Sequence, residues 1–173
     1  IIIMEDAFKD CADLKKKPMK LGLNQDVEAY LIYVEVTVDT GTSVLGQTLR
    51  FLNEKSRQEI LSCLNNSALA IPDATFFATI EEAIDGVLTG ETILFVDGFE
   101  KALKIPDGGY PSMGVSETDS EKVVRGSNEG LCESVKLNAA LIRRRIRSPK
   151  VKAKQLKIGV RSNTNVYVMY VED

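Results

Sequence analysis

The stretch "VVRGSNEGLCESVKLNAALIRRRIRSP", residues 123–149, decides the fold of the second half of the chain. A short β-branched segment leads through two glycines into a run whose apolar residues recur every three or four positions, which is the spacing of a helix with one buried face. Pro149 stops such a helix, and the arginines before it complement the negative end of the helix dipole. The sequence therefore predicts a helix from about residue 131 to residue 147.

The side chains of this predicted helix divide into an apolar stripe, a polar seam and an outward basic edge. We expect Asn138, in the seam, to hydrogen-bond to the backbone of a neighbouring loop, because an unpaired buried amide costs about 1–3 kcal/mol. We expect Arg145, also in the seam, to bury its stem and to pair with a carboxylate. The stripe consists of Leu131, Val135, Ala139, Ile142 and Ile146, and the outward basic edge consists of Lys136, Arg143 and Arg147.

The outward basic edge and the loop before the helix each admit two interpretations. Lys136, Arg143 and Arg147 form either a solvated face or a docking edge for an acidic partner or anionic lipid. The loop "RGSNEG", residues 125–130, either cradles an anion at a helix start or makes an ordinary turn. The turn is favoured, because the loop has neither P-loop nor GxGxxG spacing and because Glu129 and Glu133 occupy the place of a phosphate.

Composition argues against catalysis. The chain of 173 residues contains no histidine, and its three cysteines, Cys11, Cys63 and Cys132, lie far apart. Without histidine, the commonest general base, the commonest metal ligand and the usual partner of a nucleophilic serine or cysteine are all missing. The net charge of −3 gives no overall attraction to nucleic acid. We therefore predict no catalytic residue, no metal, no cofactor and no nucleic-acid partner.

The first half of the chain predicts helices around a central strand. Residues 1–16 have a helical pattern that ends at "KKKP", and we expect a linker to follow Pro18. Residues 27–38 are β-branched and aromatic on both faces, which indicates a strand in the middle of a sheet. Two helices are expected between residues 43 and 64, with a break around "NEKSR".

Turn and cap signals delimit the remaining elements. Thr79 and Glu82 form a capping box ahead of a helix that Gly90 closes. The pair Asp97-Gly98 predicts a type I′ hairpin turn. A second hairpin is expected near the C-terminus, from strands at 155–161 and 166–171 around a polar turn.

Together these elements predict an α+β (mixed α/β) fold of two small subdomains. Each subdomain is expected to be a short mixed sheet with hairpins packed against helices. The Gly-, Pro- and Ser-rich connection at 106–121 marks the boundary, which gives an N-terminal subdomain at 1–108 and a C-terminal subdomain at 109–173. No apolar run approaches the ~20 residues that span a bilayer, so we expect a soluble chain.

The segment with the two glycines and the arginines resembles the N-terminal soluble domain of the A subunit of bacterial spore germinant receptors. That family carries the signature E.(V/I).RGP.EGF.ES...N..LIRRRI..P, followed by G..(T/S).T.V...Y. The chain departs from the signature at Ser127 and Leu131, and it has Asn128 where the family prefers Arg. The matching positions are Glu121, Arg125, Gly126, Glu129, Gly130, Glu133, Ser134, Asn138, Leu141, Ile142, Arg143, Arg144, Arg145, Ile146 and Pro149, then Gly159, Thr164, Val166 and Tyr170.

The resemblance implies a non-enzymatic domain of a nutrient-gated receptor in the inner membrane of the bacterial spore. In that family the A subunit works with a polytopic B subunit and a lipoprotein C subunit, and further A subunits are additional candidate partners. The family also implies a C-terminal transmembrane region, which is absent from this chain. We therefore expect a domain that acts in signal transduction and receptor assembly during germination.

Two other functions compete with this expectation. The first is binding of a small nutrient in a cleft between the two subdomains. Because we find no clustering of aromatic residues with convergent charges in the sequence, we expect no nutrient to bind better than about millimolar. The second is an anion- or nucleic-acid-binding module that uses the outward basic edge, and it agrees least with the overall charge.

Overall fold

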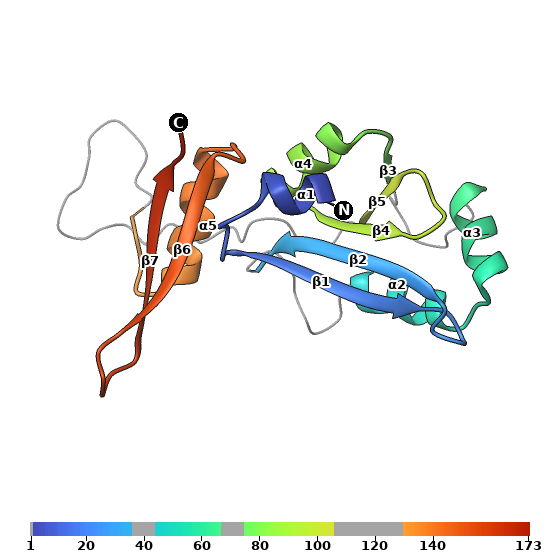
Figure 1. Ribbon diagram of the computed structural model, residues 1–173, viewed down its shortest axis with the longest axis horizontal. Helices are drawn as coiled ribbons and strands as arrows, with labels where there is room; N and C mark the ends of the chain where they lie inside the picture. Colours follow the sequence, from blue (N-terminus) through green and yellow to red (C-terminus); the bar gives the residue numbers. More distant parts are fainter. Residues whose placement is uncertain (1, 36–43, 67–74, 106–129) are drawn as a thin grey trace.

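Five antiparallel strands form the larger of two sheets in the computed structural model, which describes residues 2–35, 44–66, 75–105 and 130–173. The strand order is β1-β2-β4-β5-β3, so β2 lies inside the sheet, as the sequence predicted, and β1 and β3 form its edges (Figure 1). The strands are β1 (Leu14–Leu21), β2 (Val27–Val34), β3 (Thr75–Phe77), β4 (Thr92–Val96) and β5 (Ala102–Ile105).

Helices cover both faces of the large sheet, and each face has its own apolar core. Leu31 and Leu94 point into the core shared with α2 and α3, whereas Ile32 and Ile93 point into the core shared with α1 and α4. Successive residues of a strand alternate between faces, which is why a strand buried on both sides has the unbroken apolar sequence seen in β2. The helices are α1 (Ile2–Ala7), α2 (Val44–Asn53), α3 (Arg57–Asn65) and α4 (Ile80–Leu88).

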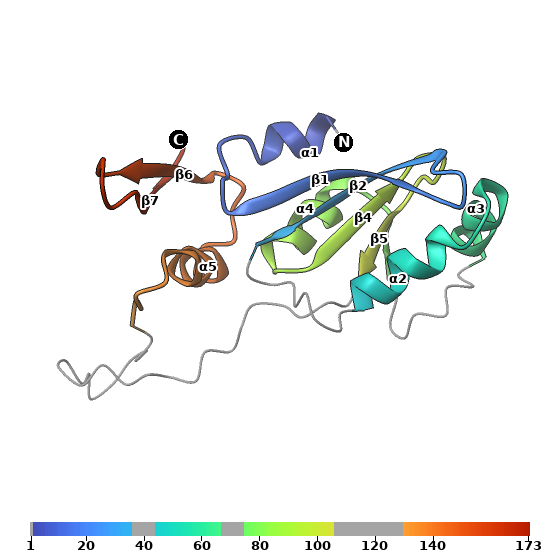
Figure 2. The same cartoon turned by 90° about the horizontal axis from the view of Figure 1, so that it is seen from below.

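A smaller module made of one helix and one hairpin lies at the end of the large sheet (Figures 1 and 2). Helix α5 (Val135–Arg145) packs against β7 (Thr164–Val171), which pairs antiparallel with β6 (Val151–Ile158). Both apolar clusters of the described structure are built from residues between 4 and 105. The smaller module therefore joins the large sheet by other contacts, which are described below.

The N-terminal prediction is wrong in part. Helix α1 ends at Ala7, and the residues predicted as the end of the helix and a linker form strand β1 instead. Leu14 and Leu21 at the two ends of β1 are buried, and the whole strand pairs with β2. Pro18 is tolerated because β1 is an edge strand, which has hydrogen-bonded neighbours on one side only.

The helix boundaries in the middle of the chain are confirmed. Helices α2 and α3 are separated at the predicted break, and Ser56 and Glu59 form a capping box at the start of α3. The predicted capping box of Thr79 and Glu82 begins α4. Gly90 closes α4 with φ of 91°, and its N–H donates to the carbonyl of Val87 at 3.0 Å.

Both predicted hairpins are present, but one turn differs. Strands β4 and β5 pair around Asp97-Gly98, yet only Gly98 has a positive φ, so the predicted type I′ turn is wrong. Asp97 instead extends the strand, since its N–H donates to the carbonyl of Glu28 at 2.8 Å. In the C-terminal hairpin, β6 begins at Val151, four residues earlier than expected.

The α+β class is confirmed. Pairing within both sheets is antiparallel, where mixed sheets were expected, and the parallel contact is a single bridge between Cys11 and Ala153. The predicted boundary between 1–108 and 109–173, with the connection at 106–121, lies outside the described residues and stays a prediction. Among the helices that the structure describes, none is long and apolar enough to cross a membrane.

Candidate functional site at the junction of the two sheets

The backbone before β1 joins the small hairpin to the large sheet. The N–H of Ala12 donates to the carbonyl of Ala153, and the N–H of Ala153 donates to the carbonyl of Asp10, both at 2.9 Å. Cys11 lies between these two contacts and bridges Ala153 in the parallel sense. Residues 10–12 therefore act as a short third strand beside β6.

A buried ion pair lies next to this bridge. The guanidinium of Arg143, on α5, donates through Nε and Nη2 to the two carboxylate oxygens of Asp13, and the Nη2–Oδ1 distance is 3.0 Å. Nη2 also donates to the carbonyl of Val151, at 3.0 Å. The Arg143 side chain is 0% exposed and that of Asp13 is 5% exposed. The forked geometry fixes the direction of both side chains, so the pair ties helix, hairpin and sheet together.

A second, more exposed set of charges lies beside the buried pair. Glu35, directly after β2, accepts a hydrogen bond from Lys136 on α5 at 2.7 Å and contacts Lys15 of β1 at 3.4 Å. Burial by itself raises the pKa of Glu35, but the bond from Lys136 and the charge of Lys15 outweigh burial and hold this pKa below its ordinary value of 4.5. Glu35 is therefore ionised at neutral pH and bridges both modules.

The thiol of Cys11 is a structural group. Burial raises its pKa more than the neighbouring charge of Arg143 lowers it, so the thiol stays protonated. Its Sγ donates to the carbonyl of Val151 at 3.5 Å. Because the thiolate is the nucleophilic form, a buried thiol with a raised pKa argues against a reactive cysteine at the junction.

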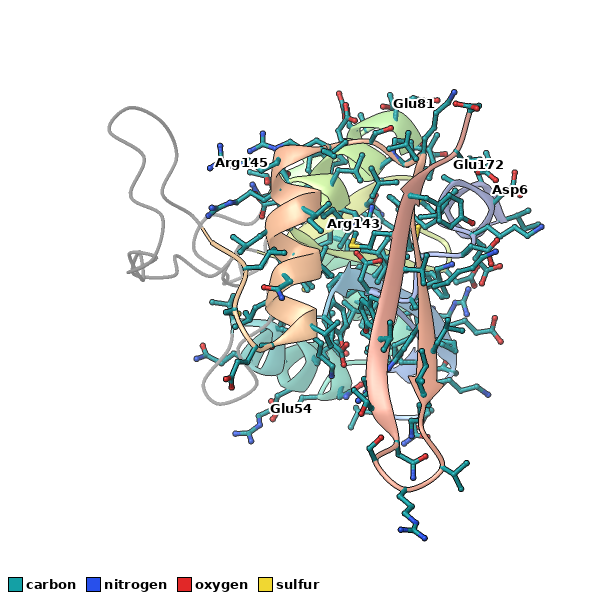
Figure 3. The ribbon with its side chains drawn as sticks, turned by 90° about the vertical axis from the view of Figure 1, so that its left-hand side faces the viewer. Asp6, Glu54, Glu81, Arg143, Arg145 and Glu172 are labelled. Atoms are coloured by element: carbon teal, nitrogen blue, oxygen red, sulfur yellow. The ribbon has the colours of Figure 1, made fainter. Side chains whose placement is uncertain are left out.

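The predicted orientation of the basic residues on α5 is wrong. Arg143 was expected on an outward docking edge, but it is the buried member of the junction, and Lys136 on the same side pairs with Glu35. Arg145 was expected to be buried in the seam, but it is exposed on the opposite side of the helix (Figure 3). Of the proposed docking edge, Lys136 is exposed but paired with Glu35, and Arg147 lies exposed beyond the end of the helix.

Small residues explain this orientation. Ala139 and Ala140 are the buried apolar residues of α5, and they lie on the same side as Lys136 and Arg143. The predicted stripe begins and ends outside the helix, with Leu131 71% and Ile146 44% exposed. The adjacent pair of alanines, which allows close approach of a helix, is the signal that indicates the buried face better than the larger apolar residues.

Asn138 has the backbone partners that were expected of it. Its Nδ2 donates to the carbonyl of Cys132 at 2.6 Å, and its Oδ1 accepts from the N–H of Cys132 at 2.8 Å. These bonds hold the segment before α5, whose first turn Ser134 caps. The helix consequently begins at Val135, four residues later than predicted.

The structure describes only some of the other signature residues. Arg125, Gly126 and Glu129 lie outside the described residues, as does the β-branched segment before them. Gly130 and Glu133 lie in the irregular segment that leads into α5, and Arg144 follows Arg143 in the last turn of the helix.

The hollow at the junction is very small. At the junction, Asp13, Glu35, Lys136 and Tyr167 contribute to the lining of a space of about 10 Å³, which has room for no more than about one water molecule. The predicted nutrient cleft between the subdomains is therefore not formed by these residues.

A groove of about 830 Å³ lies instead on the open part of the large sheet, next to α1. It brings aromatic and charged side chains together, so our expectation of no such cluster is wrong. Tyr30, in its floor, donates to Glu5 at 3.1 Å, and burial together with this bond raises the pKa of Tyr30 to about 12. The remaining aromatic and charged residues of the lining are Phe95, Phe99, Lys16, Lys20, Glu28 and Asp97.

Metal-binding chemistry is not supported by the described residues. Within residues 2–35, 44–66, 75–105 and 130–173, no three Cys, Asp or Glu side chains gather in a way that could hold a metal ion. The chain contains no histidine. The polar groups at the junction are instead engaged with one another.

The fold and the junction define an α+β domain in which a helix–hairpin module is fastened to a five-stranded sheet by a buried ion pair. Residues 3–173 match the family model described as Bacillus/Clostridium GerA spore germination protein. The chain belongs to this family, which confirms the resemblance seen in the sequence.

Two similar proteins with curated names are a sporulation protein and a germination protein. The chain is 33% identical over 150 residues to Stage V sporulation protein AF of Bacillus subtilis (strain 168), which covers 86% of this chain and 30% of the relative. It is 30% identical over 165 residues to Spore germination protein A1 of the same strain, which covers 95% of this chain and 33% of the relative. The chain thus spans about a third of the length of these relatives.

A solved structure has the same fold. The N-terminal domain of the A subunit of the Bacillus megaterium spore germinant receptor GerK3 superposes with a TM-score of 0.67 over 98% of this chain and 62% of that chain. The sequence identity is 20%, so the match shows the fold alone.

Replacing Arg143 by alanine should detach the helix–hairpin module. The substitution leaves Asp13 as an uncompensated buried charge, a defect that typically costs about 3–5 kcal/mol. Urea denaturation measures the loss, with Arg147→Ala as the matched control, because Arg147 is exposed and its removal should change the free energy of unfolding by less than about 0.5 kcal/mol. Equal stability of the two variants would contradict the role assigned to the buried pair.

Stability should also depend on the ionisation of Glu35. Its pKa is lowered in the folded chain, so its contribution is present above the ordinary value of 4.5 and is lost as the pH falls through the folded value. We expect Glu35→Gln to lower the melting temperature at pH 7, and this difference from wild type should shrink below about pH 4.5. The exposed Glu100→Gln serves as the control. A difference between wild type and Glu35→Gln that stays constant with pH would refute the linkage.

Proposed function

We propose that this chain is the N-terminal domain of the A subunit of a spore germinant receptor and that it acts, without catalysis, in receptor assembly and signal transduction. Its family membership and the shared fold with a receptor A-subunit domain support this role. The parent protein would lie in the inner membrane of the spore. In support of a membrane location, the chain is 27% identical, over 94% of its length, to a relative named Uncharacterized membrane protein YfkQ.

The polar junction is the observation that carries the proposal. The helix–hairpin module contributes no residue to the two apolar clusters of the described structure. Polar contacts join it to the large sheet and its helices, namely those of Arg143, Lys136 and Lys152 and a short backbone bridge. Polar contacts of this kind have discrete geometries, so their rearrangement would change the relation of the two modules. We propose that the B and C subunits, and further A subunits, are the partners that bind this domain and are affected by such a change.

Germination of spores tests the proposal. In the full-length subunit, Glu35→Gln removes the charge that holds Lys15 and Lys136, while the buried pair remains. We expect slower nutrient-triggered germination at a normal subunit level, with Lys157→Gln on the exposed part of the hairpin as the control. Wild-type germination of the Glu35→Gln spores, with normal subunit levels, would overturn a signalling role for the junction.

The sheet-face groove supports a second candidate function, binding of a small nutrient. Its volume suits an amino acid, sugar or nucleoside, and Tyr30 and Phe95 offer apolar contact beside charges of both signs. The groove is open to solvent, however, and exposed charges contribute little to affinity.

We therefore still expect nutrients to bind the isolated domain no better than about millimolar. Titration with amino acids, sugars and nucleosides, followed by the NMR shifts of groove residues, measures this affinity. A micromolar ligand whose affinity falls in Lys20→Glu would make nutrient binding the better assignment, because Lys20 contributes to the groove lining and lies far along β1 from the junction.

A further inference from the structure

The hydroxyl group of Tyr167 is buried near the junction without a partner among the described residues. Tyr167 lies on β7, and its oxygen forms no hydrogen bond with any residue that the structure describes. The hydroxyl of Tyr30, in contrast, donates to Glu5 at 3.1 Å. Buried polar groups are nearly always hydrogen-bonded, so the hydroxyl of Tyr167 needs a partner that no described residue provides.

Tyr167 contributes to the lining of the small hollow at the junction. The hollow has a volume of about 10 Å³, and Asp13, Val34, Glu35 and Lys136 complete the lining. Burial raises the pKa of the Tyr167 hydroxyl above its ordinary value of 10.0, and the charge of Glu35 raises this pKa further. The hydroxyl is therefore protonated at neutral pH and is able to donate a hydrogen bond.

Two carboxylates of the lining can each accept a further hydrogen bond. The contacts of Glu35 with Lys136, at 2.7 Å, and with Lys15, at 3.4 Å, both end on Oε1, which leaves Oε2 as an acceptor. Each carboxylate oxygen of Asp13 accepts one bond from Arg143, and such an oxygen has room for a second. The lining thus combines one hydroxyl donor with two acceptors.

We propose that one water molecule occupies this hollow and joins β7 to the large sheet. The water accepts the hydrogen bond of Tyr167 and donates one hydrogen bond to Oε2 of Glu35 and one to the carboxylate of Asp13. The volume fits a single water molecule, and three polar partners are typical of a buried one. Because Asp13 precedes β1 and Glu35 follows β2, the water bridges the hairpin to the end of the large sheet.

The charges around the hollow favour a neutral occupant. The carboxylates of Asp13 and Glu35 lie beside three cationic side chains, those of Lys15, Lys136 and Arg143. A metal ion would add positive charge where cations already outnumber carboxylates, and an anion would face carboxylates that only accept hydrogen bonds. Water fits both conditions, since it is uncharged and both accepts and donates.

The water gives β7 a link of its own to the large sheet. No direct hydrogen bond joins β7 to that sheet within the described part of the chain, whereas β6 is held by the backbone bridge at Ala153. A water-mediated hydrogen bond is nearly as favourable as a direct one. The inference concerns the position of the hairpin and does not depend on the role proposed for the domain.

Replacing Tyr167 by phenylalanine gives opposite results for a hydrated and a dry hollow. With the water bound, the variant loses a hydrogen bond, and its folding equilibrium constant falls by roughly two- to tenfold. In a dry hollow, phenylalanine removes an unpaired buried hydroxyl, so the variant is at least as stable as the wild type. Urea denaturation at pH 7 measures the difference, and a variant at least as stable as the wild type would overturn the proposal.

Tyr170→Phe is the matched control for this comparison. Tyr170 lies on the same strand, is 36% exposed, and retains its ring contact with Lys154 when only the hydroxyl is removed. Its folding equilibrium constant should change by less than about twofold.

A double-mutant cycle tests whether Tyr167 and Glu35 share the water. In a Glu35→Ala background the water has already lost one acceptor, so the loss caused by Tyr167→Phe should be at least about twofold smaller than in the wild type. Additive effects of the two substitutions would contradict the bridge.

A high-resolution crystal structure of the wild-type chain gives the direct observation. We expect electron density for a water oxygen about 2.5–3.0 Å from Oη of Tyr167, and within hydrogen-bond distance of Asp13 and Glu35. A hollow without density, an ion in place of the water, or a direct bond from Tyr167 to either carboxylate would show that the assignment is wrong.

Discussion

The buried contact between Arg143 and Asp13 is the interaction on which the relation of the two modules depends. The apolar clusters hold the large sheet and its four helices together, but they include no residue of α5, β6 or β7. A two-stranded hairpin is marginal in water by itself. The forked ion pair, together with its bond to the carbonyl of Val151 and the backbone bridge at Ala153, therefore specifies where the hairpin lies. A buried pair adds little net stability but is costly to break, so its main effect is on orientation.

This arrangement gives the two edges of the hairpin different roles. On one side, Ala153 of β6 is bonded to residues 10–12, and the charges of Lys136 and Glu35 lie nearby. On the other side, β7 has no second strand neighbour among the described residues. The direct contacts of the hairpin with the large sheet therefore lie at its β6 edge, next to the polar junction.

Local signals predicted most of the fold. The capping box of Thr79 and Glu82, the closing Gly90 and the apolar run of β2 specify their elements within a few neighbouring residues. The junction could not be predicted in this way, because Asp13 lies 130 positions before Arg143, and the three consecutive arginines differ only in their phase around the helix. The large apolar residues of the predicted stripe suggested one buried face of α5, whereas the buried apolar residues of the helix are Ala139 and Ala140. Likewise, the groove residues come from α1, from β1, β2 and β4 and from the turn after β4, which become neighbours only in the folded domain.

Amide hydrogen exchange in the Arg143→Ala variant tests most directly whether the buried pair holds the two modules together. If it does, the amides of Ala12, Ala153 and the β6–β7 hairpin lose protection, while those of Leu31 and Leu94 in the large sheet remain as slow as in the wild type. Unchanged protection at Ala12 and Ala153 would show that the backbone bridge holds the hairpin without the ion pair. Equal loss of protection throughout the described residues would show that the modules form one cooperative unit, which would also contradict a junction made chiefly by polar contacts.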